Sequence, residues 1–412
     1  MRYYLIGNPL CHSVSPRLHA LFGNPDYGLM ELAEKDLPGF FKARDFDGLN
    51  VTIPFKRAVL PFLDEVSKRA EEIGAVNTVK KRADGSLFGD NTDCAGVEYL
   101  AACRGVAFYG QKILILGTGG TAHTVRYEAM RQGAREIVMV SRSGPCDYEN
   151  VYLHQDADVI FNATPVGMYP DSFSCPIDVS RFPALSGVLD AIYNPLQTQL
   201  VKNARALHIR AGNGLPMLAA QARLSEEIFT GTRISEADTT RALNALRREM
   251  TSVVLIGMPG SGKTTLGRLC AKTLMREMLD TDEMIVKKTG MEIPEIFERY
   301  GEQRFRELEE DAVAEAMLRG GRVVAVGGGA VMSEKNRAAL RMNGRIYLID
   351  RPLDKLDRAG RPLSKSTQVL EKMRERRAPV YRELADKTID NTAPAETAAR
   401  AITEDFNAYS GD

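Results

Sequence analysis

Two short apolar runs, rich in β-branched residues, each lead directly into a cluster of glycines. The first run spans residues 112–116 and is followed by Gly117-Thr-Gly-Gly-Thr-Ala122; the second spans residues 252–256 and is followed by Gly257-Met-Pro-Gly-Ser-Gly-Lys-Thr264. An apolar run of this length with glycines behind it is typical of a buried parallel strand that turns into a helix, whose N-terminus can bind phosphate. The pattern therefore predicts two nucleotide sites in two separate domains.

The same patterning outlines the two domains. Residues 136–140 and 322–326 are further apolar runs, and they predict one more strand in each nucleotide-binding sheet. Residues 234–250 predict an amphipathic helix, and the second strand follows it almost at once, without a flexible spacer. We expect an α/β fold with a boundary near residue 250: a first domain over residues 1–249 and a second, with a central parallel sheet, over residues 250–412.

Composition and charge narrow the function classes. The chain has 412 residues, and 54 Lys and Arg balance 54 Asp and Glu, so the formal net charge is zero. This argues against a nucleic-acid binder that relies on a general positive field, and no apolar run approaches the roughly 20 residues that cross a bilayer. The six cysteines are scattered and the N-terminus lacks a signal-peptide core, which indicates the cytoplasm. We expect small-molecule partners, and no pattern predicts an oligomeric state.

The first glycine cluster fits the dinucleotide-binding pattern G-x-G-x-x-[G/A]. Gly117 permits the tight turn, Gly119 lets the backbone approach a pyrophosphate, and Ala122 lets the helix pack on the strand. The strand over residues 136–140 ends in Ser141-Arg142-Ser143, where an NAD site would place an acidic residue. A cation flanked by hydroxyls suits a 2′-phosphate and favours NADP(H); the alternative is a solvated arginine at a strand end. The cofactor is expected to contact Gly117, Gly119, Gly120, Ala122, Ser141, Arg142 and Ser143.

Short polar motifs precede this cluster. They are Gly7-Asn-Pro-Leu-Cys-His-Ser-Val-Ser-Pro16, Leu49-Asn-Val-Thr-Ile-Pro-Phe-Lys56, Gly74-Ala-Val-Asn-Thr78 and Gly89-Asp-Asn-Thr-Asp93, and each alone is typical of a turn. Three more follow: Asn162-Ala-Thr-Pro-Val-Gly-Met168, Tyr193-Asn-Pro-Leu196 and Gly214-Leu-Pro-Met-Leu-Ala-Ala-Gln221. Together and in this order they resemble the shikimate dehydrogenase family over residues 1–248. The resemblance implies a substrate lobe (about 1–100 plus 215–249) and a Rossmann lobe for NADP (about 101–214).

The resemblance implies reversible NADPH-dependent reduction of 3-dehydroshikimate to shikimate, with Lys56 and Asp93 as the catalytic pair. Hydride addition to a ketone leaves an alkoxide, so a positioned cation that can also donate a proton lowers the barrier, and an adjacent carboxylate orients it. By motif position, the substrate would contact Ser13, Ser15, Thr52, Asn77, Tyr193 and Gln221. The nicotinamide side would be lined by Asn162, Thr164 and Met168, whereas His12 would be a structural member of its turn. Pro216 departs from the family motif and could shift where the helix that carries Gln221 begins.

The second glycine cluster fits the phosphate-loop pattern G-x4-G-K-[ST] in full. Backbone amides of such a loop cradle the phosphates, Lys263 reaches the β- and γ-phosphates, and Thr264 offers its hydroxyl to Mg²⁺. A strand before the loop and a helix after it strengthen the interpretation. ATP is expected to contact Gly257, Gly260, Ser261, Gly262, Lys263, Thr264 and Thr265.

The elements downstream of the phosphate loop point to the second substrate. Leu279-Asp-Thr-Asp282 places two carboxylates at the end of a predicted strand, and Phe305-Arg-Glu-Leu-Glu309 places Arg306 on a helix with Glu309 one turn away. Gly327-Gly-Gly329 lets a small ligand approach the backbone, and Arg361-Pro-Leu and Arg377-Ala-Pro-Val-Tyr381 follow. In this order, the elements resemble shikimate kinase from about residue 252 to the end.

This second resemblance implies specific roles. Shikimate would be bound by Asp282, Arg306, Gly328, Gly329 and Arg377, with the arginines pairing with its carboxylate. Asp282 would also orient the attacking 3-hydroxyl as base, Asp280 would lie on the magnesium side with Thr264, and Lys263 and Arg361, the latter from a mobile lid, would neutralise the transferring phosphoryl group. The lid is shorter than is usual for the family, which leaves the adenine-side role of Arg358 open. For any one of Arg374, Arg376 and Arg377, a solvated helix face is the alternative.

The two halves name consecutive steps of one pathway, because shikimate is the product of the first and the substrate of the second. We expect a bifunctional enzyme of aromatic amino-acid biosynthesis that uses NADP(H), ATP and Mg²⁺. Three alternatives stay open on the sequence: a quinate dehydrogenase half that uses NAD, a half that is a degenerate regulatory binding module, and a phosphate-loop switch protein.

Overall fold

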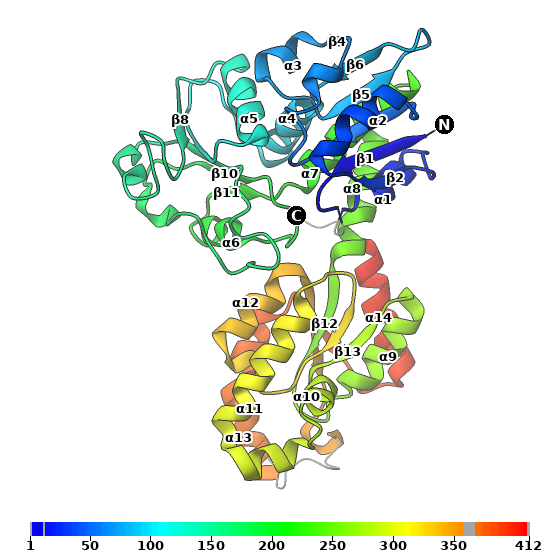
Figure 1. Ribbon diagram of the computed structural model, residues 1–412. Coiled ribbons are helices and arrows are strands. Elements are labelled where there is room, and N and C mark those ends of the chain that lie inside the picture. Colours follow the sequence, from blue (N-terminus) through cyan, green and yellow to red (C-terminus); the bar gives the residue numbers. More distant parts are fainter. Residues whose placement is uncertain (1, 11–12, 357–366, 410–412) are drawn as a thin grey trace. The chain divides into compact units, whose positions relative to one another are not determined.

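The computed structural model describes residues 2–10, 13–356 and 367–409, which form two compact units (Figure 1). The first comprises Met1–Asn194 and Thr198–Leu246, and the second comprises Pro195–Gln197 and Arg247–Asp412. The division falls within helix α8 (Glu236–Met250). Three residues discussed above, His12, Arg358 and Arg361, lie outside the described residues. Within those residues, no helix combines the length and the apolar character that a membrane crossing requires.

The part of the first unit that the sequence predicts as the substrate lobe is built on a six-stranded mixed sheet in the order β2-β1-β3-β5-β6-β4. Strands β1 and β3 pair in parallel, whereas β5 is antiparallel to both β3 and β6. The strands are β1 (Tyr3–Gly7), β2 (Gly28–Glu31), β3 (Gly48–Val51), β4 (Glu65–Val66), β5 (Thr78–Lys81) and β6 (Leu87–Asp90). The helices of this lobe, besides α8, are α1 (Ser15–Leu21), α2 (Leu37–Ala43), α3 (Lys68–Ile73), α4 (Asp93–Arg104) and α7 (Leu215–Thr230).

The part of the first unit that the sequence predicts as the nucleotide-binding lobe contains a five-stranded, fully parallel sheet in the order β11-β10-β9-β7-β8. Its elements are β7 (Lys112–Leu116), α5 (Gly120–Arg131), β8 (Glu136–Val140), β9 (Val159–Asn162), β10 (Gly187–Asp190), α6 (Gln199–Ala206) and β11 (Arg210–Gly212). The strand order reverses between β7 and β9. Because ligands bind at the carboxyl ends of strands where the order reverses, the loops after β7 and β9 mark the site.

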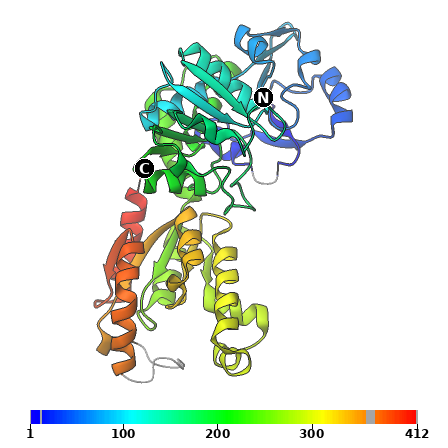
Figure 2. The same cartoon turned by 90° about the vertical axis from the view of Figure 1, so that its left-hand side faces the viewer.

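The second unit is also a parallel sheet, in the order β13-β14-β12-β15-β16. Its strands are β12 (Ser252–Ile256), β13 (Met278–Asp280), β14 (Val323–Ala325), β15 (Gly344–Asp350) and β16 (Lys387–Asp390). Its helices are α9 (Lys263–Leu274), α10 (Thr281–Thr289), α11 (Ile293–Met317), α12 (Glu334–Asn343), α13 (Thr367–Leu384) and α14 (Ala395–Ala408). Figure 2 shows α11 (yellow) and α14 (red) on opposite sides of the strands.

Alternation along the central strands explains why both parallel sheets need helices on both faces. In β12, Val254 and Ile256 join the core under α11, α12 and α13, whereas Val253 and Leu255 join the core under α9 and α14. The five residues of β7 are likewise all buried; Leu114 and Leu116 belong to one core, and Ile113 and Ile115 belong to the other. A continuous apolar run is therefore what a strand covered on both faces requires. The predicted α/β fold class is confirmed.

Candidate active sites

Lys56 and Asp93 form a buried ion pair in the first unit. Lys56 lies in the turn after β3, and Asp93 is the first residue of α4. The Lys56 Nζ donates to the Asp93 Oδ2 at 2.5 Å, and the two side chains are 15% and 8% exposed. A short charge-assisted hydrogen bond with so little exposure holds the ammonium group in one place.

Two predicted substrate contacts adjoin this pair. The Asn77 Nδ2 donates to the Asp93 Oδ1 at 2.8 Å and lies 3.5 Å from the Gln221 Oε1. Asn77 directly precedes β5, and Gln221 projects from α7. Pro216 lies in the first turn of α7, where a helix tolerates proline, so the helix carrying Gln221 begins at Leu215. The fold thus gathers Lys56, Asp93, Asn77 and Gln221 from four separate segments.

The glycine loop after β7 adjoins the same pair. A Cβ atom placed on Gly120, the first residue of α5, would lie 3.5 Å from the Lys56 Cδ. Gly117 has a φ of 109°, which disfavours any other residue, and a Cβ atom there would lie 3.0 Å from the Thr164 Cγ2. At Gly119 a Cβ atom would meet no protein atom within 4 Å, so the backbone is open to a ligand. Ala122 is fully buried. This arrangement fits the pyrophosphate of a dinucleotide.

The remaining predicted residues of the first unit surround this centre without bonding to it. The Ser13 Oγ donates to the Ser15 Oγ at 3.1 Å, and Thr52 directly follows β3. Tyr193 is partly buried after β10, and burial raises the pKa of its hydroxyl. Among the described residues, no hydrogen bond joins Ser13, Thr52 or Tyr193 to the Lys56–Asp93 pair.

The residues predicted to contact the nicotinamide and the 2′-phosphate differ in exposure. Arg142 and Ser143 are exposed beyond the end of β8, with Ser141 partly buried, and Met168 is 44% exposed. Asn162 is fully buried instead: its Oδ1 accepts hydrogen bonds from the Thr164 N at 3.1 Å and the Thr164 Oγ1 at 2.7 Å. Its side chain therefore shapes the loop after β9, and a contact of this loop with the nicotinamide stays a prediction for Thr164 and Met168.

Asp190, at the end of β10, is a buried carboxylate that the sequence reasoning missed. Its Oδ1 accepts from the Asn162 Nδ2 at 3.0 Å and its Oδ2 from the Thr198 Oγ1 at 2.7 Å. Burial raises its pKa to about 7. An acidic residue that closes an apolar run, as in Gly187-Val-Leu-Asp190, is the signal that could have identified it.

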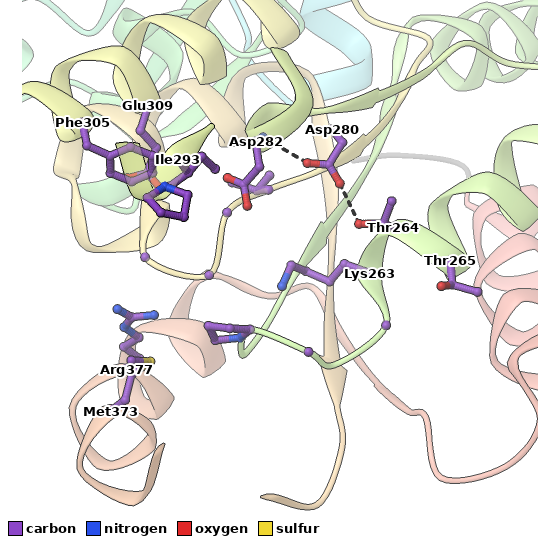
Figure 3. Close-up of a pocket in the computed structure, with 18 of the residues that line it drawn as sticks. Lys263, Thr264, Thr265, Asp280, Asp282, Ile293, Phe305, Glu309, Met373 and Arg377 are labelled. Carbon is purple, nitrogen blue, oxygen red and sulfur yellow. Dashed lines mark hydrogen bonds between the residues drawn. The ribbon is translucent and has the colours of Figure 1, made fainter. Parts of the chain in front are cut away.

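The second unit holds a pocket of about 530 Å³ around the phosphate loop (Figure 3). It is lined by segments from the loop, the end of β13, α11, the three-glycine turn after β14, and α13. The predicted residues that line it are Gly260, Gly262, Lys263, Thr264, Thr265, Asp280, Asp282, Arg306, Gly328, Gly329 and Arg377. Gly257 has a φ of 144° at the start of the loop, and Ser261 is fully buried beneath it.

Oxygen atoms suited to magnesium meet at one side of this pocket. The Thr264 Oγ1 donates to the Asp280 Oδ2 at 2.6 Å, and the Asp280 Oδ1 accepts from the Asp282 N at 3.0 Å (Figure 3). Within the described part of the chain, no three His, Cys, Asp or Glu side chains gather as a metal-ligand group. Mg²⁺ is commonly held by one or two protein oxygens together with substrate phosphates and water, so a hydroxyl and a carboxylate here fit it.

Two carboxylates crowd the first glycine of the three-glycine turn, and a guanidinium packs against the third. A Cβ atom on Gly327 would lie 2.8 Å from both the Asp282 Oδ1 and the Glu309 Oε1. The Glu309 Oε2 accepts from the Arg306 Nη1 at 2.8 Å, and Arg306 in turn packs against Gly329. Burial raises the pKa of Glu309 to about 7 although Arg306 opposes the shift. A larger residue at position 327 would therefore require these carboxylates to move.

Arg377 is the one arginine of its run that lines the pocket. The Arg374 Nη2 lies 3.9 Å from the Asp350 Oδ1, and the side chain of Arg376 is exposed on α13. One turn beyond Arg377, the Tyr381 hydroxyl donates to the Gly328 carbonyl at 2.5 Å, which ties α13 to the three-glycine turn. Arg361 lies outside the described residues, so its predicted role is not part of this geometry.

The sequence reasoning missed several pocket residues. Arg351, directly after β15, lines the pocket, and its buried Nε has no hydrogen-bond partner among the described residues. An arginine at a strand end beside a phosphate loop was the signal for it. The apolar side of the pocket was missed as well, because nothing in the local sequence distinguishes its side chains from those of the core. It consists of Ile293, Pro294, Phe297, Phe305 and Met373.

Comparisons with known proteins agree on both units. Residues 5–79 match the family described as shikimate dehydrogenase substrate binding domain, and residues 259–407 match the family described as shikimate kinase. The chain is 36% identical over 256 residues to a shikimate dehydrogenase (NADP(+)) of Caldicellulosiruptor bescii, which covers 55% of this chain and 88% of that protein.

Solved structures show the same likeness for the first unit. A chorismate mutase/shikimate 5-dehydrogenase fusion protein of Clostridium acetobutylicum superposes with a TM-score of 0.56 and 34% identity, covering 60% of this chain and 96% of that one. The shikimate 5-dehydrogenase of Thermus thermophilus, solved in complex with NADP(H) and shikimate, gives a TM-score of 0.54 and 32% identity over 60% and 99% of the two chains.

Proposed function

This chain belongs to the shikimate dehydrogenase family in its first unit and carries a shikimate kinase domain in its second, and from that premise we propose the order and chemistry of two reactions. It is a bifunctional enzyme of the shikimate pathway. The first unit reduces 3-dehydroshikimate to shikimate with NADPH. The second unit transfers the γ-phosphoryl group of ATP, with Mg²⁺, to the 3-hydroxyl of shikimate. The main support for this order of reactions is that both matching families act on shikimate by their names: shikimate dehydrogenase for the first unit and shikimate kinase for the second.

In the reduction, the nucleotide supplies a hydride to the ketone carbon. Lys56 then stabilises the negative charge that develops on the ketone oxygen and donates a proton from its Nζ. Asp93 keeps the ammonium group oriented through the 2.5 Å hydrogen bond. Asn77 and Gln221 bond ring hydroxyls, Tyr193 assists, and Ser13, Ser15 and Thr52 bind the rest of the substrate. The contact between Asn77 and Gln221 supports their shared role. NADPH is bound by Gly117, Gly119, Gly120, Ala122, Ser141, Arg142, Ser143, Thr164 and Met168, and the open backbone of the glycine loop supports this proposal for the pyrophosphate.

In the phosphorylation, bound ATP and Mg²⁺ supply the phosphoryl group and neutralise its charge. Thr264 and Asp280 are the oxygen ligands available to the metal, and Lys263 is the cation of the phosphate loop. Asp282 faces the glycine turn and accepts the proton of the attacking hydroxyl. Arg306 and Arg377, from α11 and α13, pair with the shikimate carboxylate, and Gly328 and Gly329 let the ring approach the backbone.

A coupled assay tests both steps in one chain. Purified protein with 3-dehydroshikimate, NADPH, ATP and Mg²⁺ should oxidise NADPH and release ADP in equal amounts. Shikimate 3-phosphate should be the final product. Quinate offered with NAD⁺ should react far more slowly than shikimate with NADP⁺; the reverse would identify a quinate dehydrogenase.

Two lysine variants separate the sites. Lys56→Ala should lower the reduction rate by about 10²- to 10⁴-fold, the usual contribution of a general acid, while leaving phosphorylation of added shikimate intact. Lys263→Ala should abolish only the phosphorylation. Lys68→Ala and Lys335→Ala, at exposed lysines, are the matched controls. Loss of both activities in a folded Lys56→Ala protein would contradict two independent sites, and phosphorylation by Lys263→Ala would contradict the kinase assignment.

A further inference from the structure

Three hydroxyl groups form a triangle behind the Lys56–Asp93 pair. The Oγ1 atoms of Thr78 and Thr92 are 3.1 Å apart, and the Ser225 Oγ lies 2.9 Å from the first and 3.1 Å from the second. All three side chains are fully buried. We call these three residues the hydroxyl triangle. Buried hydroxyl groups are costly unless their hydrogen bonds are satisfied, so the bonds that this cluster makes indicate its role.

Each corner of the hydroxyl triangle adjoins one residue of the proposed reduction site. Thr78 directly follows Asn77, Thr92 directly precedes Asp93, and Ser225 lies one helical turn beyond Gln221. The Ser225 Oγ also donates to the Gln221 carbonyl at 2.9 Å. The triangle therefore connects β5, the start of α4 and α7, which are the three elements that present Asn77, Asp93 and Gln221.

The triangle determines which way the amide of Asn77 faces. The Asn77 Oδ1 accepts hydrogen bonds from the Thr92 N at 2.7 Å and from the Thr78 and Thr92 hydroxyls, both at 3.1 Å. With its oxygen held by three donors, the amide must direct its Nδ2 at the Asp93 Oδ1, 2.8 Å away. The opposite orientation would bring the amide oxygen against the carboxylate of Asp93 and would leave those donors without an acceptor.

Asn50 completes the arrangement from β3. Its Nδ2 donates to the Ser225 Oγ at 2.8 Å and the Thr78 Oγ1 at 3.1 Å, and its Oδ1 accepts from the Tyr27 hydroxyl at 2.8 Å. Because Tyr27 occupies the amide oxygen, Asn50 can approach the hydroxyl triangle only as a donor. The hydroxyl protons of the triangle are then available to the two acceptors beside the site, the Asn77 Oδ1 and the Gln221 carbonyl.

We propose that the hydroxyl triangle of Thr78, Thr92 and Ser225 is a positioning device for the reduction: it fixes the amide of Asn77 and thereby keeps Asp93 and Lys56 aligned with the substrate. The inference rests on the reduction proposed for the first unit. The three residues act through Asn77 and are positioning residues, not catalytic ones. Catalysis is sensitive to such alignment, since a displacement of about 1 Å at a reacting group lowers rates by about 100-fold.

Near-isosteric variants test this proposal. Thr78→Val removes one hydroxyl while keeping the side-chain shape, and Ser225→Ala removes another from α7. Each should lower kcat for the reduction of 3-dehydroshikimate by about 10- to 100-fold and leave the KM for NADPH within about twofold. Thr78→Ser, which keeps the hydroxyl, should retain most of the wild-type rate. Phosphorylation of added shikimate should be unchanged in every variant.

Thr239→Val is the matched control. Thr239, on α8, is also a fully buried threonine of the first unit, but among the described residues its hydroxyl bonds only to the carbonyl of Ser235, which directly precedes the helix. It should reduce 3-dehydroshikimate at the wild-type rate. NADPH binding and the melting temperature, recorded for all variants, separate a misplaced Asn77 from loss of the fold; Ser225→Ala, the smaller change, is the deciding variant if Thr78→Val does not fold.

The outcomes are distinct. Wild-type rates in both Thr78→Val and Ser225→Ala would overturn the positioning role, and so would an equal loss in Thr239→Val or a Thr78→Ser protein as slow as Thr78→Val. A wild-type protein without any reduction of 3-dehydroshikimate would instead refute the proposed function of the first unit.

Discussion

Glu309 lies on the pocket side of α11 with only 2% of its side chain exposed. Burial raises its pKa to about 7, and Asp282 adds to the shift, whereas Arg306 and Arg377 oppose it. The folded protein therefore binds a proton at Glu309 over a pH range in which the unfolded chain, with a glutamate pKa of 4.5, has already lost it. The contribution of Glu309 to stability is present below that range and is lost as the pH rises through about 7.

Glu309→Gln should remove this dependence, since a neutral amide resembles the protonated acid. Between pH 5 and pH 8, the variant should gain about 2 to 3 kcal/mol of stability relative to the wild type. Calorimetry would measure the unfolding of the second unit, which is recognised as the transition whose melting temperature rises when ATP and Mg²⁺ are added. The same substitution at the exposed Glu315, also on α11, serves as control. If the stability of Glu309→Gln and that of the wild type change equally between pH 5 and pH 8, Glu309 is ionised over this whole range.

Short motifs identified several candidate side chains of the proposed reduction site, whereas they gave no sign of the residues behind them. A polar motif contains each of Lys56, Asp93 and Asn77. The alternation of apolar and polar residues in these motifs does not fit an element that packs into the core. Ser225 stands outside any motif and meets Thr78 and Thr92 only through contacts 147 and 133 residues apart. Such a contact depends on how α7 packs on the substrate lobe, and this packing leaves no local trace in the sequence.

At the scale of elements, the strand–loop–helix units were the most predictable part of the fold. The run at 112–116 is β7 and the run at 252–256 is β12, as expected because a short, mainly apolar run ended by glycine favours a strand buried on both faces. The mixed sheet of the substrate lobe was not predicted strand by strand. Its strands have two to five residues, and β4 consists of Glu65 and Val66 alone, too short for any alternation to show.

A substitution at Gly119 should distinguish the contribution of the loop after β7 to stability from its contribution to cofactor binding. Its backbone lies in the extended region that alanine also adopts, and a Cβ atom there would meet no protein atom. Gly119→Ala should therefore keep the wild-type melting temperature but raise the KM for NADPH by about tenfold or more, because the methyl group occupies the approach of the pyrophosphate.

Gly39→Ala is the control for this substitution. Gly39 lies on α2 with open space around it, so neither stability nor the KM for NADPH should suffer. If Gly119→Ala bound NADPH as tightly as the wild type, the cofactor would not approach the backbone at Gly119. If it lost stability instead, the loop would be serving the fold.

At the scale of the whole molecule, each unit carries the full set of described residues proposed for its own reaction. Those of the reduction fall between Ser13 and Gln221, and those of the phosphorylation between Gly257 and Arg377. Neither set borrows a side chain from the other unit. Two separate sets of proposed residues do not require direct transfer of shikimate between them, so the intermediate is expected to pass through solution.

Mixing two inactive chains tests that expectation. Lys56→Ala cannot make shikimate and Lys263→Ala cannot phosphorylate it, yet their mixture should convert 3-dehydroshikimate to shikimate 3-phosphate. The reaction should begin with a lag while free shikimate accumulates, and the wild type at the same concentration of sites should show the same lag. Unlabelled shikimate added to labelled 3-dehydroshikimate should dilute the label in the product equally in both. A mixture that fails although each half-reaction proceeds, or a wild type without lag and without dilution, would show that shikimate is passed on within one chain.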